Sequence, residues 1–291
     1  MFLAFIILIM FVLLLVIRVP IALILGIVSL IYIFVTKQYF LTTNLSQQLF
    51  SGVQSFSLLA IPLFMVAGEL MNASGITVRL IDFAKKAVGH FRGGLAYVNV
   101  IANMFLASII GSATAQMAMM SKIMIPEMER SGYKREFAAA TTVSAALLGP
   151  IIPPSMLFII YAVGASVSVN DMFMAGVIPG ILLALSFIIL IMILGIKAIY
   201  PSSEKAAFKE VVRSFVKIIP ALLVPLTIIV GTVGGIFTAT ESAAVACVIA
   251  IIVGLFFYRE LKIKEFPKIL VNATIATAVV TLLMSMASMF G

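Results

Sequence analysis

The sequence predicts an all-α, polytopic membrane protein whose hydrophobic segments are interrupted by small, polar and proline-rich breaks. Of its 291 residues, 63% are hydrophobic and only 10% are charged, and the mean hydropathy is +1.26. Soluble domains are roughly 45–50% apolar and about 25% charged. A soluble core of this composition would leave too few polar residues to cover its surface, so the lipid bilayer is the solvent that fits.

A spanning helix needs about 20 predominantly apolar residues. Nine segments have a suitable composition, although several of them are shorter than this length. They are Phe2–Ile17, Pro20–Val35, Leu58–Met71, Leu95–Ile125, Phe137–Ala165, Met172–Ile196, Ile218–Gly231, Ala239–Phe257 and Ile269–Phe290.

The basic residues predict the orientation of these segments. We place Arg18 in the cytoplasm, alternate sides from there and treat Leu95–Ile125 as a re-entrant hairpin that returns to its own side. The cytoplasmic side then holds 17 of the 19 Lys and Arg residues, with Lys37 outside and Lys122 within the hairpin. A single crossing by Leu95–Ile125 would divide the basic residues between the two faces. The positive-inside bias therefore favours the hairpin, a periplasmic N-terminus and no nucleic-acid partner.

Two connectors have the pattern of basic amphipathic helices. Ile76–Phe91 and Ser203–Lys217 both alternate apolar residues with Lys, Arg and Asp or Glu. Helices of this kind lie in the membrane interface. We therefore expect both connectors to be helices on the cytoplasmic surface.

A weak internal similarity links the two ends of the chain. Early in the sequence, Arg18–Phe34 is followed by the apolar segment Ile61–Met71. Near the end, Thr238–Phe257 is followed by Val280–Gly291. In the predicted topology each late segment crosses in the opposite direction to its early counterpart, which is typical of an inverted-topology repeat. The second repeat would then stop before its own counterpart of the hairpin.

The first interruption is Gly111–Gln116, midway through the predicted hairpin. Its small residues allow a sharp turn, and the hydroxyls of Ser112 and Thr114 with unpaired carbonyls would offer oxygen ligands. Non-helical backbone at membrane depth is tolerated only where it is buried in protein or lines a cavity. A small-residue face for helix packing explains the same pattern without a ligand.

The second interruption is Gly149–Ser155, in the centre of Phe137–Ala165. Its three prolines, Pro150, Pro153 and Pro154, remove backbone donors and clash with preceding carbonyls. A plain kink usually needs one proline, so three of them predict an unwound stretch. Exposed carbonyls and facing half-helix ends favour a cation such as Na⁺.

The third interruption, Gly234–Ser242, is better interpreted as the capped start of a helix. Thr240, Glu241 and Ser242 suit an N-terminal turn, where the helix dipole favours an acid. Enzyme motifs such as a nucleophile elbow or a Walker loop are absent from the sequence. The lone His90 has no second His or Cys beside it, so no transition-metal site is expected. Energy for transport would come from an ion gradient or from another chain.

Three motifs in this order resemble the large membrane subunit of the TRAP (tripartite ATP-independent periplasmic) transporters. The first runs from Ile110-Gly-Ser-Ala-Thr-Ala through Lys122–Tyr133, and the others are Gly149–Ser155 and Gly235–Ala246. The resemblance implies Na⁺-coupled uptake of organic anions such as sialic acid or C4-dicarboxylates across the bacterial inner membrane. It also implies two partners, a small membrane subunit and a periplasmic substrate-binding protein.

The resemblance further implies an ion-transporter superfamily fold with scaffold and transport domains and an elevator-type movement. On this basis the scaffold helices of the first repeat take residues 1–75, and its transport region, with hairpin and broken helix, takes residues 93–200. The amphipathic surface segments take residues 76–92 and 201–217. An incomplete second repeat takes residues 218–291, so a second hairpin and a second cation site are expected to be missing.

Carried over to this chain, the Na⁺ site would use oxygens of Ile110 and Ser112 at the hairpin tip and of Gly149, Ile152 and Pro154 in the broken helix. Many family members have Ser where this chain has Ile110, so only a main-chain carbonyl can serve there. The remaining candidates, on the substrate side of the site, are Gly111, Ala113, Thr114, Pro153 and Ser155.

The residues alone leave a competing function open. An ion channel lined by the turn Gly111–Gln116 would also need small residues and oxygen ligands at membrane depth. A channel conducts without a binding protein and shows no saturation, so a flux assay separates it from a transporter. An ion-coupled permease without a binding protein is a second alternative.

Overall fold

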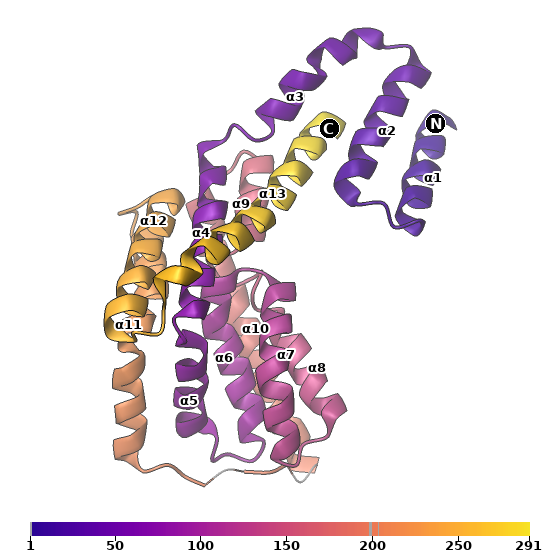
Figure 1. Ribbon diagram of the computed structural model, residues 1–291. Coiled ribbons are helices and arrows are strands. Elements are labelled where there is room, and N and C mark those ends of the chain that lie inside the picture. Colours follow the sequence, from indigo (N-terminus) through magenta and orange to yellow (C-terminus); the bar gives the residue numbers. More distant parts are fainter. Residues whose placement is uncertain (1, 198–199, 203) are drawn as a thin grey trace. The chain divides into compact units, whose positions relative to one another are not determined.

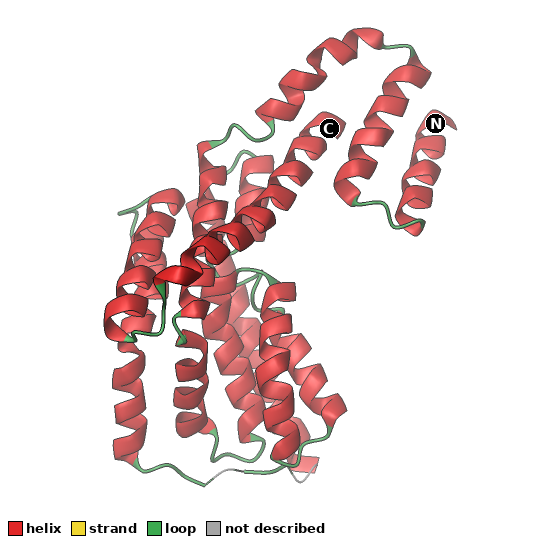
Figure 2. Cartoon of the chain, viewed as in Figure 1, coloured by secondary structure: helices red, strands yellow, loops and turns green. Residues whose placement is uncertain are grey.

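The computed structural model describes residues 2–197, 200–202 and 204–291, and these residues contain helices and no strand (Figures 1 and 2). The α-helices are α1 (Phe2–Val16), α2 (Ile21–Thr36), α3 (Leu45–Ser51), α4 (Ala60–Ala73), α5 (Ile76–Val88), α6 (Gly94–Ile110), α7 (Ala113–Arg130), α8 (Arg135–Ala146), α9 (Met156–Gly164), α10 (Val169–Lys197), α11 (Phe208–Val233), α12 (Ala239–Ile252) and α13 (Phe266–Phe290). A π-helix, Val253–Phe257, follows α12, and short 3₁₀ turns are Tyr39–Asn44, Phe56–Leu59 and Ile263–Glu265.

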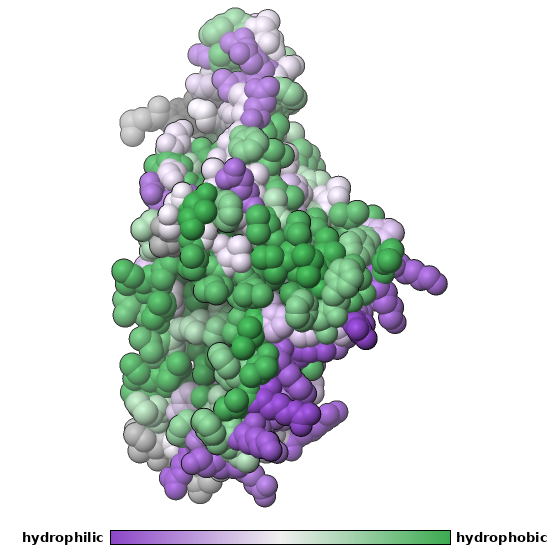
Figure 3. Space-filling view, turned by 90° about the vertical axis from the view of Figure 1, so that its left-hand side faces the viewer, coloured by the Kyte–Doolittle hydropathy of each residue, from purple (hydrophilic) through white to green (hydrophobic). Residues whose placement is uncertain are grey.

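Within the described residues, five helical segments are long and apolar enough to cross a membrane. They are Phe56–Ala73, Val169–Gly195, Phe208–Thr232, Ala239–Phe257 and Ile263–Phe290. Many of their large apolar side chains face outward, such as Ile178 of α10 and Leu226 of α11, which are 68% and 54% exposed. Figure 3 shows one face on which apolar side chains cover a broad area beside hydrophilic patches. Because water does not tolerate so large an apolar surface, the prediction of a polytopic α-helical membrane protein is confirmed.

The chain divides into two compact units, the first being Met1–Leu59 with Thr274–Gly291. In this unit α1 and α2 pair through a tight turn in which Arg18 has a positive φ of 64°. The later part of α13 packs on α3, where the Ser285 hydroxyl donates to the Leu49 carbonyl at 2.7 Å. Gly52 of this unit lies directly against Ser288.

The second unit is Ala60–Ala273, and it contains all three predicted interruptions. In it α4 packs against α12, α5 lies between α6 and α11, and α7 packs against α8 (Figure 1). The polar contacts of α6 and α7 show that they are antiparallel. The side-chain nitrogen of Asn99, early in α6, lies 3.7 Å from the Met128 sulfur at the end of α7. Near the turn, the Gln116 amide donates a hydrogen bond to the side-chain oxygen of Asn103. The predicted segment Leu95–Ile125 is therefore a helical hairpin.

Helix α11 differs from the sequence prediction at its start. A separate surface helix was expected over Ser203–Lys217, but the helix begins at Phe208 and continues without interruption to Val233. Residues 204–207 are not helical, and Ser203 lies outside the described residues. Neither glycine nor another helix breaker separates the amphipathic part from the apolar part before Pro220, so the two form one helix. The other surface segment is a helix as expected, α5.

Candidate functional site

The hairpin turns at two residues between α6 and α7. Gly111 has φ +60° and ψ 8°, a left-handed conformation that glycine adopts at no steric cost. Ser112 is extended, and α7 begins at the next residue. The Ser112 and Thr114 hydroxyl oxygens lie 3.2 Å apart, so the tip offers two neighbouring hydroxyls.

The proline-rich stretch breaks the helix as the sequence predicts. Helix α8 ends at Ala146 and α9 begins at Met156, and residues 147–155 between them form turns and bends. The Ser155 hydroxyl closes this stretch by donating to the Pro150 carbonyl at 2.7 Å. Six other carbonyls of the stretch accept no hydrogen bond from any described residue, and they belong to Leu147, Gly149, Ile151, Ile152, Pro153 and Pro154.

The fold brings the hairpin tip and the broken helix into contact. A methyl group added at Gly111 would lie 3.1 Å from the Pro154 carbonyl oxygen and 3.3 Å from the Met156 nitrogen. A methyl group added at Gly149 would lie 3.4 Å from the Ser112 carbonyl carbon. Each glycine therefore permits a close approach that a side chain would obstruct. We call this contact region the crossing; it comprises residues 110–116 and 147–157.

Helix α10 packs against the broken-helix part of the crossing. A methyl group added at Gly176 would lie 2.7 Å from the Ile151 carbonyl oxygen, and one at Gly180 would lie 2.5 Å from Ile152 Cγ1. The two glycines are four residues apart and so share one face of the helix. Small residues at this spacing let backbones pack closely in membrane proteins.

A buried polar network lies beside the crossing, and the sequence interpretation missed it. The Gln116 amide donates to the Asn103 side-chain oxygen at 2.8 Å, and Asn103 donates to that of Asn99, also at 2.8 Å. Asn99 in turn donates to the Thr142 hydroxyl at 2.7 Å. All four side chains are fully buried. Their only signal in the sequence is the presence of Asn, Gln and Thr at helical spacing within apolar segments.

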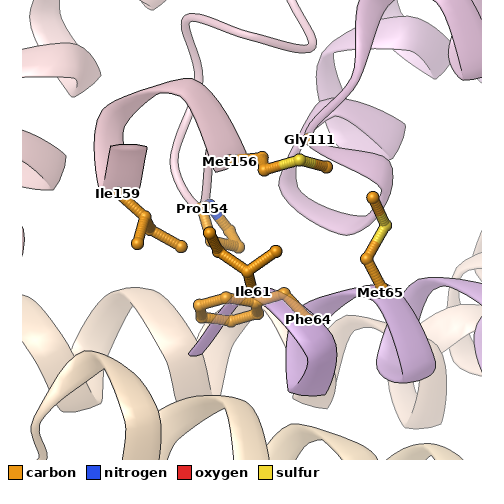
Figure 4. Close-up of a pocket in the computed structure, with 7 residues that line it drawn as sticks. All are labelled: Ile61, Phe64, Met65, Gly111, Pro154, Met156 and Ile159. Atoms are coloured by element: carbon orange, nitrogen blue, oxygen red, sulfur yellow. The ribbon is translucent and has the colours of Figure 1, made fainter. Parts of the chain in front are cut away.

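Two pockets border the crossing. The larger has a volume of about 250 Å³ and is lined by the hairpin tip and the start of α9, namely Gly111, Ser112, Ala113, Thr114, Pro150, Met156 and Leu157. The smaller, about 10 Å³, is large enough for one water molecule. Figure 4 shows it between Ile61, Phe64 and Met65 of α4 on one side and Gly111, Pro154, Met156 and Ile159 on the other.

The helix ends give the crossing two electrostatic sides. Helices α6 and α8 end here, and their carbonyl ends carry partial negative charge that favours a cation. Helices α7 and α9 begin here, and their amide ends favour an anion. The cap residues Ser112 and Ser155 make no side-chain hydrogen bond to these first turns. The larger pocket is thus bordered by two helix N-termini that lack a side-chain cap.

Most predicted site residues meet at the crossing. Ile110 ends α6 at the tip, but its side chain lies outside the described part of the structure. Ile152 is buried and turns its side chain to Gly180, which leaves only its carbonyl for a ligand. The Ser155 hydroxyl is occupied by Pro150. The other residues lie at the tip, Gly111, Ser112, Ala113 and Thr114, or in the break, Gly149, Pro153 and Pro154.

The third interruption forms a helix cap, as interpreted from the sequence. The Thr238 hydroxyl accepts from the Glu241 amide at 3.3 Å, and the Glu241 carboxylate accepts from the Thr238 amide at 2.8 Å. This reciprocal pair is a capping box at the start of α12. The residue that caps is Thr238, two positions before the predicted Thr240. No group of three potential metal ligands from His, Cys, Asp and Glu occurs among the described residues.

Comparison with known proteins assigns the chain to a family. Residues 8–291 match the DctM component of the tripartite ATP-independent periplasmic transporters. The 2,3-diketo-L-gulonate TRAP transporter large permease protein YiaN of Escherichia coli is 40% identical over 243 residues, which are 84% of this chain and 57% of that protein. The C4-dicarboxylate TRAP transporter large permease protein DctM of Pseudomonas aeruginosa is 38% identical over 247 residues, 85% of this chain and 58% of that protein.

A third relative, the sialic acid TRAP transporter large permease protein SiaM of Vibrio cholerae, is 35% identical over 265 residues, which are 89% of this chain and 62% of that protein. The chain thus spans about 60% of the length of these relatives. The family consists of transporter permeases and not of enzymes. On the family match and these identities, the chain belongs to the DctM family of TRAP transporter large membrane components.

Proposed function

We propose that the chain forms part of the large membrane subunit of a Na⁺-coupled secondary transporter that imports a small organic anion. A periplasmic binding protein would deliver the anion, and a small membrane subunit would complete the transporter in the bacterial inner membrane. The observation that supports this proposal most strongly is the crossing itself. There a helical hairpin and an unwound helix meet, as they do in carrier sites built from discontinuous helices.

The residues of the crossing fit a hard cation. The carbonyls of Gly149, Ile152 and Pro154 accept no hydrogen bond from a described residue, and each belongs to the predicted Na⁺ site. Ser112 adds a hydroxyl, and the carbonyl ends of α6 and α8 add favourable dipoles. Unwound carbonyls and helix C-termini are the groups that bind Na⁺ in secondary transporters. Ile110 would contribute its main-chain carbonyl from the other side of the tip.

The substrate side of the crossing fits an anion. The amide ends of α7 and α9 border the pocket of about 250 Å³, together with the hydroxyls of Ser112 and Thr114. No acidic side chain lines this pocket. The relatives' names specify 2,3-diketo-L-gulonate, C4-dicarboxylate and sialic acid, all of which carry a carboxylate. A carboxylate group is therefore the substrate feature that we expect the pocket to bind.

Uptake into proteoliposomes tests this function, using the intact transporter with its small subunit and binding protein. We expect accumulation of the anion when Na⁺ is present outside and loss of accumulation when K⁺ replaces it. Unchanged uptake without Na⁺ would refute the coupling. Flux that does not saturate and needs no binding protein would instead support an ion channel.

An elevator movement of the hairpin, which we propose as part of this mechanism, has a separate test. Cysteine pairs introduced between α4 and the hairpin tip, for example at Met65 and Ala113, should cross-link in only one transport state. Cross-linking that is equally efficient with and without Na⁺ and substrate would argue against a moving hairpin.

A further inference from the structure

One buried oxygen at the crossing has no hydrogen-bond partner. The Gln116 side chain is fully buried, and no donor among the described residues reaches its Oε1. A methyl group added at Gly149 would lie 2.5 Å from this oxygen, which therefore sits directly against the broken helix. Leaving a buried carbonyl oxygen unpaired costs roughly 1–3 kcal/mol. Such an atom in a folded protein needs a partner that the protein itself does not supply, such as a water molecule or an ion.

The orientation of the Gln116 amide follows from its neighbours. Its Nε2 donates to the Asn103 main-chain carbonyl at 2.6 Å and to Asn103 Oδ1 at 2.8 Å. Both partners are acceptors, so exchanging the oxygen and nitrogen of Gln116 would set oxygen against oxygen. The amide oxygen must therefore face Gly149.

Asn103 is itself fixed by the next links of the network. It donates to the main-chain carbonyl of Asn99 at 2.9 Å and to Asn99 Oδ1 at 2.8 Å. Asn99 then donates to Thr142, whose hydroxyl donates to the Ala138 carbonyl at 2.8 Å. These hydrogen bonds thus link α8 to α6 and α6 to α7, and they orient Gln116 Oε1 toward the crossing.

The surroundings of this oxygen favour a positively charged ligand. A methyl group at Gly149 would also lie 3.2 Å from the Ala146 carbonyl oxygen and 3.4 Å from the Ser112 carbonyl carbon. The cationic residue of α7 nearest in sequence is Lys122, which is exposed and about 9 Å further along the helix axis. The Ala146 carbonyl already accepts from the Gly149 amide at 3.1 Å and the Ser112 carbonyl from the Gln116 amide at 3.0 Å, so Gln116 Oε1 is the acceptor among these three that lacks a donor. One unpaired oxygen among other carbonyl oxygens, with no donor facing it, suits a cation.

We propose that Gln116 supplies a side-chain oxygen to the cation bound at the crossing, and that Asn103, Asn99 and Thr142 hold it in position. This inference rests on the proposed Na⁺-coupled function and adds to it a ligand that the sequence interpretation did not include. Gln116 would give the site one oxygen of fixed orientation, in addition to the carbonyls of the broken helix.

Binding of Na⁺ to the purified intact transporter tests the inference without measuring transport. The concentration of Na⁺ that gives half of the maximal thermal stabilisation is measured for the wild type, Gln116→Met and Thr141→Val. Gln116→Met keeps the volume and removes the oxygen. Thr141→Val, the matched control, removes a hydroxyl of α8 that donates to the Phe137 carbonyl and lies outside the network, so it reports damage to the fold.

We expect Gln116→Met to raise the half-saturating Na⁺ concentration about tenfold, which corresponds to about 1.4 kcal/mol, and Thr141→Val to change it by less than about twofold. If both variants respond like the wild type, Gln116 is not a ligand although the proposed function stands. Equal loss of Na⁺ response in both variants would likewise overturn the inference, because it would show a purely structural role. A wild type that does not respond to Na⁺ would overturn the proposed coupling and the inference together.

A second variant, Gln116→Glu, adds the pH dependence of Na⁺ affinity, which a change in packing alone would not alter. Gln116→Glu keeps an oxygen that can face Gly149 and makes it titratable, while its second oxygen replaces the Nε2 donor beside the Asn103 carbonyl and Oδ1. Beside a bound cation the carboxylate binds Na⁺ more tightly than the acid does, so Na⁺ affinity should rise with pH in this variant and not in the wild type. Gln54→Glu, at an exposed position in the other compact unit, is the matched control. Equal pH dependence in the two variants would overturn the inference.

Discussion

Gly111 lies so close to Pro154 that a methyl group on the glycine would be 3.1 Å from the proline carbonyl oxygen. The hairpin tip is 43 residues from Pro154 in the sequence, and the contact joins the two interruptions into one site. The Pro154 carbonyl accepts no hydrogen bond from the described residues, and it lies beside the turn where α6 ends. Movement of the hairpin relative to α9 would open or close this contact.

The first prediction tests this approach with Gly111→Ala. Both Gly111 and Gly235 have positive φ, of 60° and 66°, but a methyl group at Gly235 would meet nothing within 4 Å. Alanine should cost about 1–2 kcal/mol of backbone strain at either position. Only Gly111→Ala should also push the tip away from Pro154, so we expect it to lower Na⁺-dependent uptake about tenfold or more.

Gly235→Ala, the matched control, should lose thermal stability but keep its uptake. Both variants are measured in proteoliposomes and by thermal denaturation. Equal uptake by the two variants would show that the close approach at the tip has no functional role.

A second prediction concerns Gly149, which faces the Gln116 oxygen. A methyl group at Gly149 would lie 2.5 Å from Gln116 Oε1, so Gly149→Ala must displace that side chain or the break. We expect the half-saturating Na⁺ concentration to rise about tenfold, equivalent to about 1.4 kcal/mol. Gly164→Ala at the end of α9 is the control, because a methyl group there meets nothing within 4 Å. An unchanged Na⁺ requirement in Gly149→Ala would contradict the assignment of this position to the site.

The interruptions were predictable because their causes are local. A turn between two helices needs residues such as Gly111, which tolerates positive φ, and Pro150, Pro153 and Pro154 remove backbone donors wherever the chain places them. The same reasoning predicted the capped start of α12 from Thr240, Glu241 and Ser242, although the residue that caps is Thr238. In each case neighbouring residues alone determine the local backbone conformation.

The contacts between distant segments were not predictable from local pattern. The bond from Asn99 to Thr142 joins positions 43 residues apart, and the packing of Gly180 on Ile152 depends on how α10 lies against the break. Until the packing of α6 against α7 is known, the hydrogen-bond partner of Gln116 cannot be assigned from the sequence. Likewise, the start of α11 was missed because amphipathic and apolar patterns can share one continuous helix.

A third prediction separates helix capping from ion relay at Glu241. The carboxylate accepts from the Thr238 amide at 2.8 Å and the Thr238 hydroxyl at 2.9 Å. Gln at this position can still accept both bonds, so Glu241→Gln should keep uptake within about twofold of the wild type. Thr238→Ala should lower stability by about 1 kcal/mol. A loss of uptake in Glu241→Gln with unchanged melting temperature would show instead that the site needs an ionisable group.

The last prediction uses an aromatic cluster between α7 and α8. The Tyr133 ring stacks on Phe137 and Tyr200, and its hydroxyl donates to the Pro201 carbonyl at 3.0 Å. Burial raises the pKa of Tyr133 from 10.0 to about 12. Because the folded protein holds this proton more tightly than the unfolded chain does, the stability it contributes is complete below pH 10 and is lost as the pH rises to about 12.

Tyr133→Phe isolates this contribution, since phenylalanine keeps the stacking and does not titrate. Melting temperatures of both proteins are measured in detergent between neutral pH and about pH 12, where other groups destabilise both alike. We expect the wild type to lose more stability than Tyr133→Phe does above pH 10, where the unfolded tyrosine begins to ionise. Parallel curves for the two proteins across this range would show that the Tyr133 hydroxyl is not buried in the folded protein.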